Sequence, residues 1–283
     1  MKKQQIILLS GGLLLLVFLF VFGKTVPPKD ATAKPVAATE AVPAFDIKSQ
    51  LEAAKNKLTA SQQGYLNSLE SSVVRGDVKA QQLHTFHQLA AFWKDSVPSL
   101  EPYAYYTAEA SKLENSEKSL TFAAQLFLDN LRGVSDPSVK TWMANQARDL
   151  FERGLKVNPN NDSLKIGLGS SYIFGSSSDN MQEVMKGIQH ILEVSRRDST
   201  NMYAQLMLGI GGVVSGQLDK AIERLKKVAA FQPDNLEAIL TLAEAYERKG
   251  DKENARTWYV TSKKLINNPD IIKEIDQRIN LLK

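Results

Sequence analysis

The residue types that most often bind metals or transfer protons are scarce in this sequence. Its 283 residues include three histidines and no cysteine. His84 and His87 are three residues apart and would share one face of a helix, whereas His190 is distant in the sequence. Zinc enzymes bring several ligands together in motifs such as H-E-x-x-H, and the sequence contains no such motif. We therefore predict no metal site, and histidines that face solvent or are satisfied by hydrogen bonds.

Two glycine-rich stretches resemble phosphate-binding loops in composition. GLGSS at 167–171 and GIGG at 209–212 complete neither G-x-G-x-x-G nor the P-loop pattern, and no serine lies in G-x-S-x-G. The chain has 35 basic and 31 acidic residues, and its net charge of +4 is too weak and too evenly mixed to indicate nucleic-acid binding. We predict no catalytic residue, no cofactor, no nucleic-acid partner and no enzymatic activity.

The C-terminal part of the sequence contains an internal repeat, which indicates the helices that it forms. Residues 202–235 and 236–268 match each other at an offset of 34 residues, so that small residues align with small ones and turns with turns. The matched places are Gly209 with Ala243, Ala221 with Ala255, Leu208 with Leu242, and Gly216-Gln217 with Gly250-Asp251. Small residues that face each other let two helices approach closely, so each half is predicted to be a helical hairpin.

This pattern resembles the tetratricopeptide repeat (TPR), a helix-turn-helix of about 34 residues. Two earlier repeats have the same arrangement. The two positions that hold a small residue are occupied by Gly169 and Gly187 in one of them, and by Ala124 and Ala147 in the one before it. The periods are irregular, at 45, 40 and 34 residues, but the distance from the second small residue of one repeat to the first of the next is always 22. The extra residues therefore fall in the turns inside repeats, at 133–140 and 175–180.

The resemblance implies an all-α fold, a TPR-type solenoid of helix-turn-helix repeats, to which the sequence adds an N-terminal transmembrane helix and a C-terminal capping helix. We divide the chain into a short basic segment (1–5), a transmembrane signal anchor (6–22), a Pro/Ala-rich tether (23–44), a helical region that is a degenerate repeat or cap (45–118), four repeats (119–161, 162–201, 202–235 and 236–269) and the capping helix (270–283).

The N-terminus has the composition of a membrane segment. Residues 6–22 form an uncharged, largely apolar run that is short for a membrane span and long for a signal-peptide core, and no A-x-A cleavage site follows. We favour an uncleaved anchor over a cleaved signal peptide. Lys2 and Lys3 favour a cytoplasmic N-terminus, although Lys24, Lys29 and Lys34 oppose this. We expect the body to be exported, to the periplasmic side of the inner membrane in a bacterium with two membranes; cleavage would instead release it as a secreted or periplasmic protein.

In proteins that this sequence resembles, the first helix of each repeat lines a concave groove that binds a peptide or a partner helix. The groove-facing places carried over from the family are Ile166, Ser170 and Ile173, then Tyr203, Leu206, Ile210 and Val213, and finally Glu237, Leu240, Glu244 and Glu247. The middle of this line is apolar and its C-terminal end acidic, so a ligand with apolar anchors and a basic segment would complement it. The lysines and asparagines with which chaperone-binding members grip a C-terminal carboxylate are missing.

Two functions remain open from the sequence. The first is a membrane-tethered scaffold or adaptor that binds a protein or peptide partner in the groove, in envelope assembly or protein maturation. The second is a structural component that associates with further copies of itself through the apolar stripe and binds no peptide. The stripe could equally pack against the N-terminal helices, and the repeat pattern does not choose among these outcomes.

Overall fold

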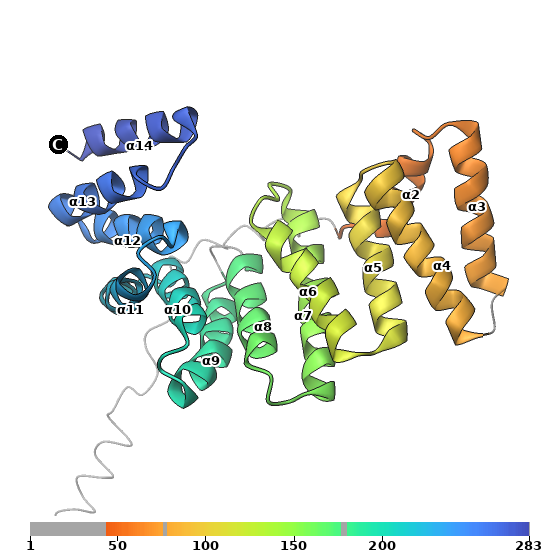
Figure 1. Ribbon diagram of the computed structural model, residues 1–283, viewed down its shortest axis with the longest axis horizontal. Coiled ribbons are helices and arrows are strands. Elements are labelled where there is room, and N and C mark those ends of the chain that lie inside the picture. The colour runs from red at the N-terminus through yellow and green to blue at the C-terminus, as the bar shows by residue number, and fades with distance from the viewer. Residues whose placement is uncertain (1–43, 76–77, 177–179, 283) are drawn as a thin grey trace, which may run out of the picture. The chain divides into compact units, whose positions relative to one another are not determined.

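A computed structural model describes residues 44–75, 78–176 and 180–282, and throughout these residues it contains helices and turns but no strand. From α3 onward the helices follow one another in chain order, each packed on the next, whereas α2 packs against α5 (Figure 1). They are α2 (Ile47–Lys55), α3 (Ala60–Arg75), α4 (Lys79–Ala91), α5 (Leu100–Glu114), α6 (Glu117–Leu131), α7 (Pro137–Val157), α8 (Asp162–Gly175), α9 (Met181–Arg197), α10 (Met202–Val214), α11 (Leu218–Phe231), α12 (Leu236–Lys249), α13 (Lys252–Lys263) and α14 (Pro269–Leu281). The prediction of an all-α helical repeat fold is confirmed for this part of the chain.

The predicted basic segment, the anchor at 6–22 and the tether up to residue 43 lie outside the described residues. Among the residues that are described, no helix combines the length and the apolar character needed to span a bilayer.

Four helix pairs form the repeats: α6 with α7, α8 with α9, α10 with α11, and α12 with α13. In two of these pairs, α8 with α9 and α10 with α11, the predicted small residues lie in close contact with the neighbouring helix. A Cβ atom added to Gly169 in α8 would lie 2.6 Å from the carbonyl oxygen of Gly187 in α9, and one added to Gly209 in α10 would lie 2.6 Å from Cγ of Leu225 in α11. No Cβ fits at such distances, so these pairs pack closely because the side chains are absent.

The ends of the repeat helices show why the hairpins recur. Asn161, Asn201 and Asn235 cap the N-termini of α8, α10 and α12, each accepting a hydrogen bond from a backbone N–H three residues on, at 2.9 to 3.0 Å. These caps satisfy amides that a helix N-terminus leaves free. Inside the last two repeats, Gly216 and Gly250 turn the chain with φ of +75° and +84°, which glycine adopts without strain.

The N-terminal region, α2 to α5, has its own apolar core, which includes Leu66, Leu89 and Trp93. At the end of α4 the backbone continues in a π-helical turn, Phe92–Ser96, which sequence periodicity did not reveal. The turn rotates the helix end and buries Phe92 and Trp93 together, with ring centroids 5.2 Å apart and nearly perpendicular.

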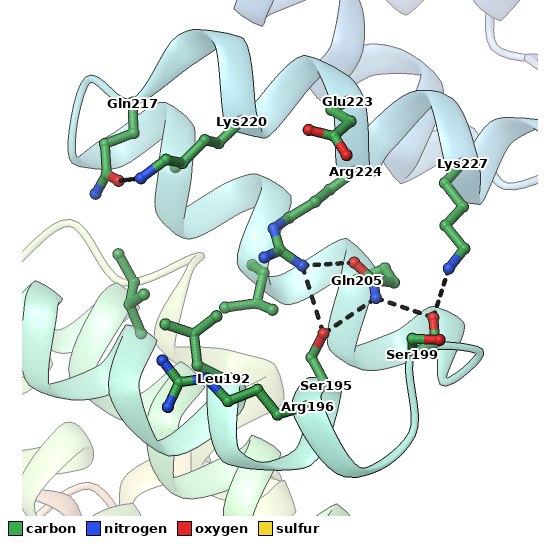
Figure 2. Close-up of a pocket in the computed structure, with 13 residues that line it drawn as sticks. Leu192, Ser195, Arg196, Ser199, Gln205, Gln217, Lys220, Glu223, Arg224 and Lys227 are labelled. Atoms are coloured by element: carbon green, nitrogen blue, oxygen red, sulfur yellow. Dashed lines mark hydrogen bonds between the residues drawn. The ribbon is translucent and has the colours of Figure 1, made fainter.

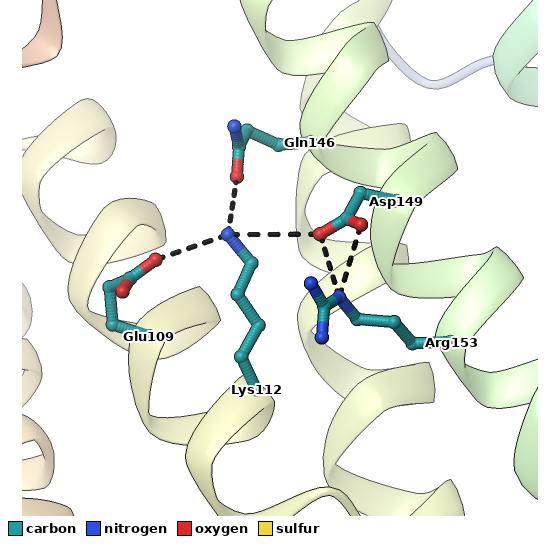
Figure 3. Close-up of polar contacts among 5 residues, drawn as sticks. All are labelled: Glu109, Lys112, Gln146, Asp149 and Arg153. Atoms are coloured by element: carbon teal, nitrogen blue, oxygen red, sulfur yellow. Dashed lines mark hydrogen bonds and ion pairs between the residues drawn. The ribbon is translucent and has the colours of Figure 1, made fainter.

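Polar contacts join this region to the first repeat at the interface between α5 and α7 (Figure 3). The Lys112 ammonium group donates to Glu109 on its own helix at 3.1 Å and to Gln146 on α7 at 3.0 Å, and it lies 3.9 Å from Asp149. Asp149 in turn accepts from Arg153 Nε at 2.9 and 3.0 Å. Because each charge here has a partner, this cluster serves packing and offers no free group to a ligand.

Candidate functional site

A groove along α12 and α14 contains most of the exposed part of the predicted binding surface. It encloses about 660 Å³, and we call it the α12–α14 groove. Its lining residues are Arg132, Leu236, Glu237, Leu240, Thr241, Glu244, Tyr259, Ile271, Glu274, Ile275 and Arg278. One edge is apolar because α14 buries Ile275 and Ile279 against the last repeat yet leaves Ile271 43% exposed. An amphipathic capping helix thus supplies both a core face and part of the groove.

The carboxylates of the α12–α14 groove and the adjoining turn of α12 are largely paired with arginines. Glu237 forms an ion pair with Arg132, which comes from the end of α6. Glu247 accepts from Arg278 Nε of α14 at 2.9 Å and from the Tyr259 hydroxyl at 2.7 Å. Burial, strengthened by this hydrogen bond to Glu247, raises the pKa of Tyr259 far above its ordinary value, so the phenol stays protonated and donates. The groove therefore combines apolar surface with charges that are already in part neutralised.

The predicted site residues separate into two groups in the structure. Glu237, Leu240 and Glu244 line the α12–α14 groove. Glu247 accepts hydrogen bonds from two of the lining residues, Arg278 and Tyr259. Tyr203 is 42% exposed. Partial burial, with the nearby charges of Asp129 and Glu237, raises the pKa of Tyr203. The other six are buried, at most 6% exposed: Ile166, Ser170, Ile173, Leu206, Ile210 and Val213.

The buried group takes part in packing between successive first helices. Five of its six members belong to one apolar cluster built by α8 to α12, and Ser170 has a buried hydroxyl with no hydrogen-bond partner. Because their side chains have almost no exposed surface, they do not form a contact face in this conformation. A role for them in partner binding remains a prediction, and the accessible surface is the acidic and apolar end.

The histidines lie apart from this groove. His84 and His87 are exposed on α4, and His190 on α9 stacks on Tyr172 with ring centroids 5.9 Å apart. Within the described ranges no three histidine, aspartate or glutamate side chains lie close enough together to hold a metal ion.

Comparison with known proteins bears directly on the repeat assignment. Residues 215–265 match the family model of the tetratricopeptide repeat, and this stretch contains three helices: α11, α12 and α13. The tetratricopeptide repeat is thus shown for residues 215–265.

Among curated proteins, the BBSome complex member BBS4 of Bos taurus is 30% identical over 127 residues, which is 45% of this chain and 23% of that protein. The same protein of Mus musculus is 28% identical over 118 residues and 21% of its length. The matched part is thus less than a quarter of these relatives. Among solved structures, a thermophilic TPR protein of Thermus thermophilus, TTC0263, has a TM-score of 0.51 at 16% identity, covering 72% of this chain and 98% of that one. At such identity the likeness concerns the fold alone.

Eight lining residues of the α12–α14 groove were not among the predicted site residues: Arg132, Leu236, Thr241, Tyr259, Ile271, Glu274, Ile275 and Arg278. Glu274 and Arg278 could have been found from the helical spacing of the capping helix, which places them one turn apart beside Ile271. Arg132 carries no local signal, because the residue it pairs with is 105 positions away in the sequence.

Proposed function

We propose that this TPR protein is a non-enzymatic scaffold that binds a protein partner in the α12–α14 groove. The observation that carries the proposal is the groove itself, in which the partly buried Leu240 and the exposed Ile271 lie beside the carboxylates of Glu244 and Glu274. A segment with apolar side chains and adjacent lysine or arginine residues is the ligand that matches it.

The energetics favour a ligand of this kind. Burial of the apolar wall contributes about 25 cal/mol per Å² of surface removed from water. Glu274 is exposed and has no ion pair among the described residues, and Glu244 lies 3.8 Å from Arg248, a weak contact at the surface. Incoming ammonium or guanidinium groups would give both carboxylates a partner. Such pairs contribute more to specificity and to the association rate than to the affinity.

We further propose that residues 6–22 anchor the protein in a membrane and that residues 23–44 hold the repeats away from it, with the body exported. The apolar run and the proline-rich composition of the sequence support this plan. Retention in membranes after alkaline extraction, together with activity of a periplasmic reporter fused after Lys283, is the expected result. Release by alkali would favour the cleaved form, and a silent reporter would contradict export.

Self-association is the competing function, and the exposed aromatic residues Phe122 and Phe231, at 58% and 67%, favour it. If it operates, the mass of the full-length protein in detergent rises with concentration in the micromolar range. A constant monomer mass would exclude it.

Site-specific photocrosslinking tests the groove. A photoreactive amino acid replaces Leu240 in the groove and, as the control, Lys226 on the exposed face of α11. We expect an adduct from position 240 whose crosslinked partner peptide carries apolar and basic residues, and no such adduct from position 226. Identical adducts from both positions, or none from position 240, would contradict the proposal.

Charge reversal provides the matched comparison. Glu244→Lys with Glu274→Lys should abolish the adduct, because two favourable charges become repulsive. Glu152→Lys with Asp234→Lys makes the same change of net charge at exposed positions outside the groove and should leave the adduct unchanged. Equal loss in both would show that the interaction depends on net charge and not on this groove.

A further inference from the structure

A second groove lies between the second helices of successive repeats (Figure 2). Its walls are α9 and α11 and its floor is α10, and we call it the α9–α11 groove. It encloses about 740 Å³. The lining residues are Ile188, Leu192, Ser195, Arg196, Ser199, Gln205, Leu208, Gly212, Gln217, Lys220, Glu223, Arg224 and Lys227. None of them lines the α12–α14 groove.

Four of the lining residues are cations, namely Arg196, Lys220, Arg224 and Lys227, against the single carboxylate of Glu223. Over the described chain, no ion pair engages any of the four cations. The other carboxylates of the two wall helices pair elsewhere: Glu193 pairs with Lys165 at 3.5 Å, Asp219 with Lys249 at 2.5 Å, and Glu183 with Arg148 at 2.9 Å. Asp198, at the end of α9, accepts hydrogen bonds from Thr200, and its charge acts on Lys227 without forming an ion pair. The groove therefore has an excess of positive charge.

Neutral oxygen atoms hold three of these cations in place. Arg224 donates to Gln205 Oε1 at 2.7 Å, Lys227 donates to the Ser199 carbonyl at 2.6 Å, and Lys220 donates to Gln217 Oε1 at 3.2 Å. Such bonds orient a charge without neutralising it, so the cations remain available to an anion.

Gln205 is the residue that fixes the centre of the groove. It is 4% exposed, and its amide nitrogen donates to Ser195 Oγ at 3.1 Å and to the Ser199 carbonyl at 3.0 Å while its oxygen accepts from Arg224. The buried amide thus connects all three helices around the groove. Burial lowers the pKa of Arg224, as expected for a guanidinium group that is partly removed from water without a full counter-charge.

We propose that the α9–α11 groove binds an acidic segment of a polypeptide partner, in which an apolar side chain sits between aspartate or glutamate residues. Leu192 on α9 gives the groove partly exposed apolar surface for that side chain, with the nearly buried Ile188 and Leu208 beneath it, and the cations on both walls meet the flanking carboxylates. A guanidinium group can receive a carboxylate with two parallel hydrogen bonds.

The shape of the groove favours a peptide over a nucleic acid. Nucleic-acid binding requires a basic stripe that follows many phosphates, whereas these four cations surround one hollow with an apolar floor. The inference goes beyond the proposed function, because it assigns a second binding site with the opposite charge preference.

The acidic probe for the test is a fluorescein-labelled peptide, Gly-Asp-Glu-Leu-Glu-Asp-Gly, and a second peptide with serine in place of leucine reports on the apolar floor. Binding to the full-length protein in a non-ionic detergent is followed by fluorescence anisotropy at low and at physiological salt. We expect saturable binding of the acidic probe that weakens as salt rises, and weaker binding of the serine peptide.

The groove variant is Arg196→Glu with Lys220→Glu, one exposed cation from each wall. The matched control is Lys226→Glu with Lys273→Glu, two exposed lysines that line neither groove. We expect the groove variant to lose about tenfold or more in affinity for the acidic probe, and the control to lose less than about twofold.

Several results would overturn the proposal. They are the absence of saturable binding by the parent protein, equal losses in the two variants, equal binding of the leucine and serine peptides, and tighter binding of a single-stranded oligonucleotide of the same charge. Circular dichroism confirms that each variant keeps its helices. If the groove variant does not fold, Lys220→Gln alone, at an exposed side chain, replaces it and should weaken the acidic probe more than Lys226→Gln does.

Discussion

The α12–α14 groove and the α9–α11 groove are built from the same kind of helix hairpin, yet their charges are balanced in different ways. Beside α12, Glu237 and Glu247 receive arginines from α6 and α14. Between α9 and α11, the cations donate to amide, carbonyl and hydroxyl oxygens, because the carboxylates of these helices other than Glu223 are paired with lysines and arginines of neighbouring helices. The groove with the more acidic sequence is therefore partly neutralised, with Glu274 left unpaired, and the larger uncompensated charge lies in the α9–α11 groove. In a repeat array, the charge of a groove depends on which helices flank it.

The largest change in stability is expected from a substitution that disturbs the helix packing on which the grooves depend. Gly169→Ala places a Cβ 2.6 Å from a backbone oxygen and 2.5 Å from Ile191 Cγ1, so α8 and α9 must separate. We expect the free energy of unfolding to fall by about 3 kcal/mol, since overpacking outweighs the gain in helix propensity.

Urea denaturation followed by circular dichroism measures this change. The control is Gly64→Ala in α3, where an added Cβ meets nothing within 4 Å, and it should leave stability unchanged or raise it by about 0.5 kcal/mol. Equal effects at the two glycines would show that α8 and α9 are not packed as described.

A milder change neutralises one cation of the α9–α11 groove, as arginines neutralise carboxylates of the α12–α14 groove. Gln217→Glu places a carboxylate beside Lys220, in the position from which the amide oxygen now accepts at 3.2 Å, at the N-terminus of α11 where negative charge is favoured. The affinity of the acidic probe should fall about fivefold, with stability retained. Unchanged affinity would mean that Lys220 does not meet the ligand.

The converse change removes the neutralising arginine from the α12–α14 groove. Arg132→Ala leaves Glu237 without its partner from α6, so a peptide with basic and apolar residues, Gly-Lys-Arg-Leu-Leu-Arg-Lys-Gly, should bind about threefold more tightly. Arg153→Ala, which removes an arginine paired with Asp149 on α7, is the control and should have no effect. Weaker binding in Arg132→Ala would indicate that the arginine itself contacts the ligand.

The smallest expected effect is a pH dependence of stability that comes from His190 on α9. Burial lowers the pKa of His190 on α9 below its ordinary value of 6.5, although the charges of Glu193 and Glu152 oppose the shift. Protonation thus favours the unfolded chain, so stability that is present above pH 6.5 is lost as the pH falls through the lowered pKa.

Thermal melts between neutral and mildly acidic pH measure that loss. His190→Gln should lose a few tenths of a kcal/mol less than the parent on acidification, because glutamine takes up no proton. A parallel pH dependence in parent and variant would exclude His190 as the titrating group. His84→Gln, at an exposed position, is the control.

Much of the fold was predictable because it rests on residues whose roles are local. Gly169 and Gly187 approach closely because neither has a side chain, and Gly216 and Gly250 form turns because glycine adopts a positive φ without strain. Both properties follow from the residue type, which the sequence gives directly. The π-helical turn at Phe92–Ser96 was not predictable, because it is set by how Phe92 and Trp93 pack on other helices.

The candidate site was only partly predictable, for a related reason. Family register predicts Leu240 and Glu244 as groove-facing, and both line the α12–α14 groove, but it cannot tell that Leu206 and Ile210, at 5% and 6% exposed, are covered by neighbouring helices. Arg132 reaches Glu237 across 105 residues, and the α9–α11 groove is assembled from two helices that belong to different repeats. Pairings of this kind depend on tertiary structure and leave no periodic signal in the sequence.

Hydrogen–deuterium exchange of the full-length protein, measured by mass spectrometry with each probe peptide in turn, tests the central claim that the array offers two separate grooves of opposite preference. The acidic probe should slow exchange in α9 and α11, and the basic and apolar probe should slow exchange in α12 and α14. Protection of the same helices by both probes, or protection outside these four helices, would contradict the account.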